Sequence, residues 1–251
     1  AMDDDAYTTA CVDDLTQVFD MMTSGDVAAM IAEPIQGVGG FATPPDGFFG
    51  AMKKELDNRG VLFISDEVQT GWGRTGDHFW GYQAHGITPD ILTFAKGVGN
   101  GLALGGVVAS AELMDSLPGN SLSTFGGNPL SSAGALATIN YMLDNDTQGN
   151  SKRMGGRLVA KLQPAVDDST VVAELRGRGL MQAIETVQPG SLEPNVEAAG
   201  QIIEQARVAG LLIGKGGLYG NVLRIAPPMT VTEAEIDEAG DILVDCIKAL
   251  D

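Results

Sequence analysis

The stretch Val61-Leu62-Phe63-Ile64-Ser65-Asp66-Glu67-Val68-Gln69 joins an apolar run to a group of polar side chains. Val61–Ser65 has the length and continuous apolarity of a strand that is buried on both faces. Asp66 ends this strand, where a carboxylate is costly without a cation or hydrogen-bond donors. Ligands bind at the carboxyl ends of strands in open α/β sheets, so Asp66 is a candidate site residue. A helix cap or a structural ion pair is the alternative interpretation.

Similar apolar runs alternate with helical patterns along the first part of the chain, which predicts an α/β domain with a mainly parallel sheet. The expected strands are 27–32, 61–65, 91–95 and 106–109, and the expected helices are 13–24, 46–58 (capped by Asp46) and 128–144. A polar run at 144–151 separates this part from the remainder. We therefore predict two domains, residues 1–147 and residues 148–251.

The pattern of residues 148–251 predicts a smaller α+β domain. Its expected helices are 152–166, 195–209 and 232–250, and its expected strands are 171–175, 180–186, 211–213 and 222–225. The last helix carries a capping-box signature, Thr232 followed by Glu235.

Composition narrows the possible partners. The 251 residues carry a formal charge of −18 and are 44% hydrophobic, so the chain is globular and unsuited to nucleic acid or anionic membranes. No apolar run approaches the roughly 20 residues of a membrane span. The two cysteines, Cys11 and Cys246, form no disulfide framework, so we expect a reduced, cytoplasmic protein. The two histidines, His78 and His85, have no partners at zinc-site spacing, so no metal is expected.

Lys96 follows the apolar run Ile91–Ala95 and opens a glycine-rich loop. A lysine desolvated at such a strand end has a lowered pKa, because burial disfavours the ammonium, and its amine can form a Schiff base with a carbonyl. A lysine that ends a strand in solvent is the alternative. Lys96 and Asp66 together suit pyridoxal phosphate, since a carboxylate can keep the pyridine nitrogen protonated while a lysine holds the aldehyde.

Five motifs in sequence order extend this interpretation to almost the whole chain. They are Ala32–Gly37, Ser65–Gly76, Pro89–Gly97, Ser123–Pro129 and Leu223–Pro228. With them the chain resembles the class III pyridoxal-phosphate-dependent aminotransferases, which have fold type I. The resemblance implies a pyridoxal-phosphate enzyme that transfers amino groups from amino acids to 2-oxo acids. It also implies a homodimer with shared active sites.

The resemblance also assigns roles to individual residues. It implies that Lys96 forms the Schiff base with the cofactor and that Asp66 pairs with the pyridine nitrogen. Gln69 then contacts the ring hydroxyl, and Thr124 binds the phosphate in the neighbouring subunit's site. Arg224 binds the substrate carboxylate, a task for which a planar guanidinium is suited by its two parallel hydrogen bonds.

Within the family, the chain is most similar to the alanine–glyoxylate aminotransferase 2 type, through the stretches 78–85, 176–181 and 212–217. Family members that act on 4-aminobutyrate or ornithine carry a glutamate where this chain has Val38. The resemblance therefore favours an α-amino acid similar to alanine as donor and a glyoxylate- or pyruvate-like acceptor. An ω-amino-acid aminotransferase, a related aminomutase or a racemase remain alternatives.

Family chains also carry a segment that precedes the region matched here, with a phosphate-binding loop and an aromatic residue that stacks on the cofactor. Neither motif is found in this sequence, so we expect the chain to correspond to the C-terminal part of an aminotransferase. By itself it is then expected to lack activity, and a catalytically incompetent fragment is a further alternative.

Overall fold

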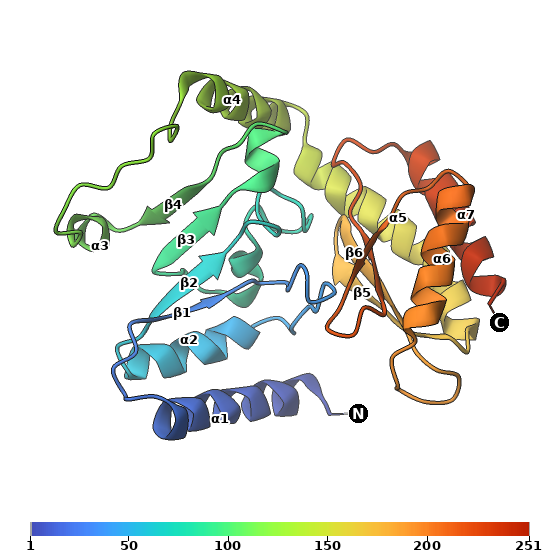
Figure 1. Cartoon of the computed structure of the whole chain (residues 1–251), viewed down its shortest axis with the longest axis horizontal. Coiled ribbons are helices and arrows are strands. Elements are labelled where there is room, and N and C mark those ends of the chain that lie inside the picture. Colours follow the sequence, from blue (N-terminus) through green and yellow to red (C-terminus); the bar gives the residue numbers. More distant parts are fainter. Residues whose placement is uncertain (1, 251) are drawn as a thin grey trace. The chain divides into compact units, whose positions relative to one another are not determined.

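Two four-stranded sheets organise the chain in the computed structural model, which describes residues 2–250 (Figure 1). The internal contacts divide the chain into two units. The first unit comprises 1–34, 44–72 and 80–144, and the second comprises 35–43, 73–79 and 145–251. The domains expected from the sequence, 1–147 and 148–251, have a single boundary. In the structure, the short segments 35–43 and 73–79 also belong to the second unit. No helix within residues 2–250 is both long and apolar enough to cross a bilayer.

The sheet of the first unit is mainly parallel. Strands β1 (Ala29–Ala32), β2 (Leu62–Asp66) and β3 (Ile91–Phe94) are parallel neighbours, and β4 (Gly106–Ala109) is antiparallel to β3. The unit's α-helices are α1 (Asp4–Met22), α2 (Phe48–Asn58), α3 (Ala111–Asp115) and α4 (Pro129–Asp144); two 3₁₀ helices are η1 (Gly81–His85) and η2 (Lys96–Gly99). Helices α1 and α2 pack with β1 and β2 around a buried cluster that includes Phe49, Leu56 and Phe63. The predicted α/β architecture is confirmed.

Two helix starts in the first unit differ from the sequence prediction. Helix α1 begins at Asp4 instead of residue 13, because the Asp3 carboxylate caps it by accepting from Ala6 N at 2.7 Å. Asp4 and Asp5 in the first turn add favourable charge at the positive end of the helix dipole. The predicted Asp46 cap of α2 is wrong: Gly47 is the N-cap and adopts φ 81°, a conformation that glycine reaches without steric cost.

The second unit is a sheet covered on one face by three helices. Its strand order is β5 (Val172–Arg178), β6 (Met181–Thr186), β8 (Val222–Ile225) and β7 (Gly214–Gly216), with antiparallel pairs throughout. Helices α5 (Thr147–Asp168), α6 (Val196–Val208) and α7 (Glu233–Lys248) pack on it around a large apolar core. Figure 1 shows the three helices together on one side of this sheet. The predicted capping box at Thr232 and Glu235 is confirmed.

Two local predictions for the second unit are wrong. The strand expected at 211–213 lies at 214–216, where Gly214 pairs with Arg224 across the ladder. The helix expected from residue 152 begins at Thr147, within the polar run 144–151, because the Asp146 carboxylate accepts from Gly149 N at 3.0 Å and caps α5. Capping therefore outweighs the low apolarity of this segment.

Adjacent glycines in α5 give a matched test of packing. A Cβ on Gly155 would lie 2.1 Å from the Gly179 carbonyl oxygen, whereas a Cβ on Gly156 would meet no atom within 4 Å. We expect Gly155→Ala to lower the free energy of unfolding by about 1–3 kcal/mol, because backbone must shift to admit the methyl group. Gly156→Ala should raise it by about 0.5–1 kcal/mol through helix propensity. Urea denaturation checks both, and equal effects would contradict the packing of α5 against the 179 turn.

Candidate active site

Asp66 and Lys96 follow the carboxyl ends of neighbouring parallel strands. Asp66 ends β2 and pairs in register with Thr93 of β3, and Lys96 lies three residues beyond Thr93. This edge of a parallel sheet is where α/β proteins bind their ligands. The half-buried Asp66 accepts a hydrogen bond at Oδ1 from Val68 N (3.1 Å), and Oδ2 accepts none from residues 2–250. Asp66 therefore keeps an oxygen for a ligand donor.

Lys96 is exposed, which agrees with the alternative of a lysine in solvent at the strand end and not with a desolvated one. Its backbone has φ 49°, in the left-handed region that non-glycine residues seldom occupy. Ala95 before it is in an unusual extended conformation (φ −164°, ψ −148°), and Lys96 begins the 3₁₀ helix η2. The chain thus turns sharply at Lys96, and such strained positions concentrate at functional sites. Exposure leaves the amine open to an aldehyde.

The carboxylate of Glu67 holds the turn that follows Asp66. Glu67 is fully buried and accepts from Ser65 Oγ (3.1 Å), Thr70 Oγ1 (2.6 Å), Gly81 N (2.7 Å) and Tyr82 N (2.8 Å). All four donors are uncharged, so hydrogen bonds alone compensate the burial of this anion. Its own backbone N–H donates to the Thr93 carbonyl (2.9 Å). Glu67 therefore connects β2, β3 and η1 next to Asp66.

The other two expected cofactor ligands lie in loops of the same unit. Gln69 is half-buried in the turn after β2. Thr124 is exposed in the loop between α3 and α4. Their roles at the ring hydroxyl and the phosphate stay predictions.

Arg224 lies in the second unit, on β8. Its Nε donates to the Lys215 carbonyl (3.2 Å) and its Nη1 to the Gly37 carbonyl (3.3 Å). The guanidinium carbon is 5.6 Å from the centre of the Phe41 ring, within cation–π range. Two of its five N–H groups are thus used by residues 2–250, and within that range no carboxylate lies at ion-pair distance. N–H groups remain for an external carboxylate.

Two residues with structural roles at these positions were missed by the sequence analysis. Glu67 was quoted only as part of a motif, although its flanking hydroxyls, Ser65 and Thr70, are local hydrogen-bond donors that could have indicated its burial. Arg176 begins the stretch 176–181, and its mostly buried side chain contacts the loop that also contacts Arg224. No signal in the sequence links Arg176 to residues some 136 positions earlier.

Residues 2–247 match the sequence model of the aminotransferase class-III family. The chain belongs to this family. It is 41% identical over 226 residues to alanine–glyoxylate aminotransferase 2 homolog 2 of Arabidopsis thaliana, covering 89% of this chain and 47% of that protein. It is 40% identical over 226 residues to the 5-aminovalerate aminotransferase of Pseudomonas putida (90% and 53%). Over 223 residues it is 37% identical to the alanine/serine racemase of Pyrococcus horikoshii (89% and 47%).

Among solved structures, a transaminase from the marine bacterium Virgibacillus superposes with a TM-score of 0.90 and 31% identity, over 97% of this chain and 57% of that chain. The chain therefore has the α/β fold of the fold type I pyridoxal-phosphate transferases, as predicted. It spans about half the length of the curated relatives that it matches. Within residues 2–250 no cluster of three or more metal-binding side chains is present.

Glu67 gives a prediction about the stability of the site. We expect Glu67→Ala to lower the free energy of unfolding by about 3 kcal/mol or more, because it leaves two backbone N–H groups, one buried and one half-buried, and two buried hydroxyls without their acceptor. Glu67→Gln should cost less, since one oxygen acceptor remains. Glu112→Ala, at an exposed position of α3, is the control and should change stability by less than about 0.5 kcal/mol. Chemical denaturation checks this, and a Glu67→Ala variant as stable as the control would contradict the role of Glu67.

Proposed function

We propose that this chain is the part of a pyridoxal-phosphate-dependent aminotransferase that carries the cofactor-binding lysine. The amino donor is an α-amino acid of the alanine type, and the acceptor is a 2-oxo acid of the glyoxylate or pyruvate class. The observation that carries the proposal is the position of Asp66 and Lys96 at the carboxyl ends of adjacent parallel strands in a class-III family member. The homodimer and the cytoplasmic location stay predictions from the sequence.

The residues at this edge fit pyridoxal phosphate. Lys96 offers an exposed primary amine, and Asp66 has a carboxylate oxygen without a donor among residues 2–250, suited to a protonated ring nitrogen. When bound, the cofactor supplies an aldehyde that condenses with amines and a ring that withdraws electrons from the substrate α-carbon. Gln69 and Thr124 are the proposed ligands of the ring hydroxyl and the phosphate.

Two residues of the chain perform the proposed chemistry. Lys96 Nζ would hold the cofactor through its aldehyde and, once its amine is free, would accept the proton from the substrate α-carbon as a general base. The negative charge of Asp66 keeps the proton on the ring nitrogen, which sustains the electron-withdrawing character of the ring.

The surroundings of Arg224 support an α-amino acid as donor. Family members specific for 4-aminobutyrate place a glutamate at position 38, and this chain has an exposed valine there. Arg224 also has no carboxylate within ion-pair distance in the described part of the chain. A guanidinium with unused N–H groups can bind a substrate α-carboxylate without first leaving an internal partner.

Identity alone does not separate the candidate substrates. The alanine–glyoxylate and 5-aminovalerate relatives are 41% and 40% identical, and one relative is a racemase. An ω-amino-acid aminotransferase, an aminomutase or a racemase would use the same lysine and aspartate. A catalytically incompetent chain would differ in cofactor affinity, so titration with pyridoxal phosphate separates it from the three enzymes.

Lys96 can be tested without measuring turnover. After incubation with pyridoxal phosphate and reduction with borohydride, we expect peptide mass spectrometry to find the cofactor attached to Lys96. Lys96→Ala should remove this label and the visible absorbance of the bound cofactor, because no other lysine in the described part of the chain follows the strand next to β2, which ends at Asp66. Lys215→Ala, which removes another exposed lysine, is the control and should keep both. Labelling mainly at Lys215 or another lysine would refute the assignment.

Substrate preference gives a second test of the proposal. With the phosphate-binding segment of the family supplied, we expect kcat/KM for alanine with glyoxylate to exceed that for 4-aminobutyrate with 2-oxoglutarate by at least about tenfold, as one charged hydrogen bond contributes roughly 1.5–3 kcal/mol. Arg224→Lys should lower kcat/KM for alanine by about 10–100-fold, because an ammonium loses one of two parallel bonds. Arg207→Lys, at an exposed ion pair with Glu204, is the control. A preference for 4-aminobutyrate would overturn the substrate assignment while leaving the family unchanged.

A further inference from the structure

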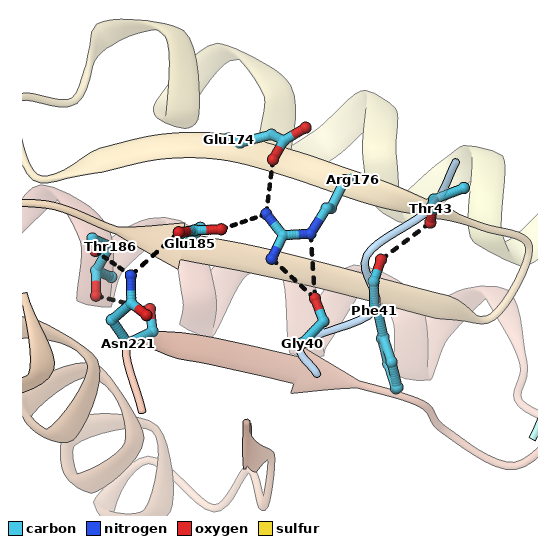
Figure 2. Close-up of polar contacts among 8 residues, drawn as sticks. All are labelled: Gly40, Phe41, Thr43, Glu174, Arg176, Glu185, Thr186 and Asn221. Atoms are coloured by element: carbon cyan, nitrogen blue, oxygen red, sulfur yellow. Dashed lines mark hydrogen bonds and ion pairs between the residues drawn. The ribbon is translucent and has the colours of Figure 1, made fainter. Parts of the chain in front are cut away.

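Arg176 is a mostly buried arginine whose guanidinium contacts three groups. Its side chain is 13% exposed and lies on β5. Its Nε (3.1 Å) and Nη2 (2.9 Å) both donate to the Gly40 carbonyl, and its Nη1 pairs with Glu174 (2.6 Å) and with Glu185. Figure 2 shows the guanidinium between the two carboxylates and the Gly40 carbonyl. One side chain therefore connects the sheet to a segment 136 residues earlier.

Glu185, one of the two carboxylate partners of Arg176, is itself held in place by a hydrogen bond. Glu185 Oε1 accepts from Asn221 Nδ2 at 3.2 Å, and Asn221 is fully buried and also donates to the Thr186 carbonyl (2.8 Å) (Figure 2). Arg176 thus has few alternative orientations, because its planar guanidinium holds the donors in a fixed arrangement and their partners are themselves fixed.

The segment that Arg176 contacts, residues 37–41, is here called the anchor loop. Phe41 is buried with Met181 and Val222, and the Val38 carbonyl accepts from Gly217 N at 3.0 Å. The fit is tight: a Cβ on Gly40, which has φ 97°, would lie 3.0 Å from a Val222 methyl group. The anchor loop is therefore packed against β8 and the turn after β7, and Arg176 binds its Gly40 carbonyl.

The same loop orients Arg224. The Gly37 carbonyl accepts from Arg224 Nη1, and the Phe41 ring lies beside its guanidinium. Gly37 and Phe41 are the two ends of the anchor loop, and Gly40, which Arg176 binds, lies between them. A displacement of the Gly40 carbonyl would consequently move two of the groups that contact Arg224, the Gly37 carbonyl and the Phe41 ring.

We propose that Arg176 is a positioning residue for carboxylate recognition: it fixes the anchor loop, and the loop fixes the direction of the Arg224 guanidinium. The inference rests on the proposed function only in taking Arg224 as the carboxylate-binding residue. Arg176 itself touches neither substrate nor cofactor in this scheme. It sets how well the remaining N–H groups of Arg224 are aligned before a carboxylate arrives, which lowers the ordering cost of binding.

Arg176→Lys is the decisive variant. Lysine keeps the positive charge beside Glu174 and Glu185 but cannot donate from two nitrogens at once to the Gly40 carbonyl oxygen. The matched control is Arg157→Lys, since Arg157 makes a two-bond contact with Asp237 (2.7 Å each) on the helical side of the same unit. Thermal unfolding of both variants verifies that the fold is retained.

The first measurement is independent of activity. Hydrogen exchange of the 251-residue chain should show at least tenfold faster exchange at Gly40 N–H and Gly217 N–H in Arg176→Lys, and no change in Arg157→Lys. The Arg224 Nε–H resonance, identified by its loss in Arg224→Lys, should shift in Arg176→Lys only. Unchanged exchange and an unchanged resonance would overturn the inference.

The second measurement uses the protein loaded with pyridoxal phosphate. Arg176→Lys should raise KM for alanine about tenfold while kcat changes by less than about threefold, because carboxylate binding is affected and the chemistry at Lys96 is not. A KM equal to that of Arg157→Lys, or a loss confined to kcat, would overturn the inference. If the parent protein has no activity even when the phosphate-binding segment of its family is supplied, the proposed function fails, and the exchange and resonance measurements still decide the role of Arg176.

Discussion

The buried carboxylate of Glu67 is the interaction on which the candidate site depends. It receives four hydrogen bonds from uncharged donors, two from side chains beside it and two from backbone N–H groups of η1. These bonds offset the desolvation of a charge that contacts no cation among residues 2–250, so removing a donor leaves part of that cost uncompensated. The turn that begins at Asp66 is therefore held in one conformation, and the Asp66 carboxylate with it.

In the second unit, two arginines bind segments that are distant in sequence. Arg74 Nη1 donates to the carbonyls of Pro227 (2.6 Å) and Leu180 (3.3 Å), and Arg176 donates twice to the carbonyl of Gly40. Burial lowers the pKa of Arg74, but a guanidinium keeps its proton throughout the physiological range. These contacts explain why residues 35–43 and 73–79 belong to the second unit, although both follow strands or turns of the first.

The candidate residues differ in how far the sequence could identify them. Asp66 and Lys96 were found because each follows an apolar run that could be assigned as a strand, and strand order then placed both at one edge. The exposure of Lys96 could not be predicted, since it depends on a positive φ and on which side chains surround the turn. The Asp46 cap failed because several residues near a helix start can cap it, and backbone conformation selects among them.

The sequence by itself determined the alternation of strands and helices, the family motifs, and the residue types that suit pyridoxal phosphate. These are local properties, since periodicity and capping act within a few residues. Only the tertiary structure decided which segments join which unit, that four donors converge on Glu67, and that Arg176 and Arg224 contact one loop. Such contacts join residues that are up to 187 positions apart, and their partners are set by packing rather than by spacing along the chain.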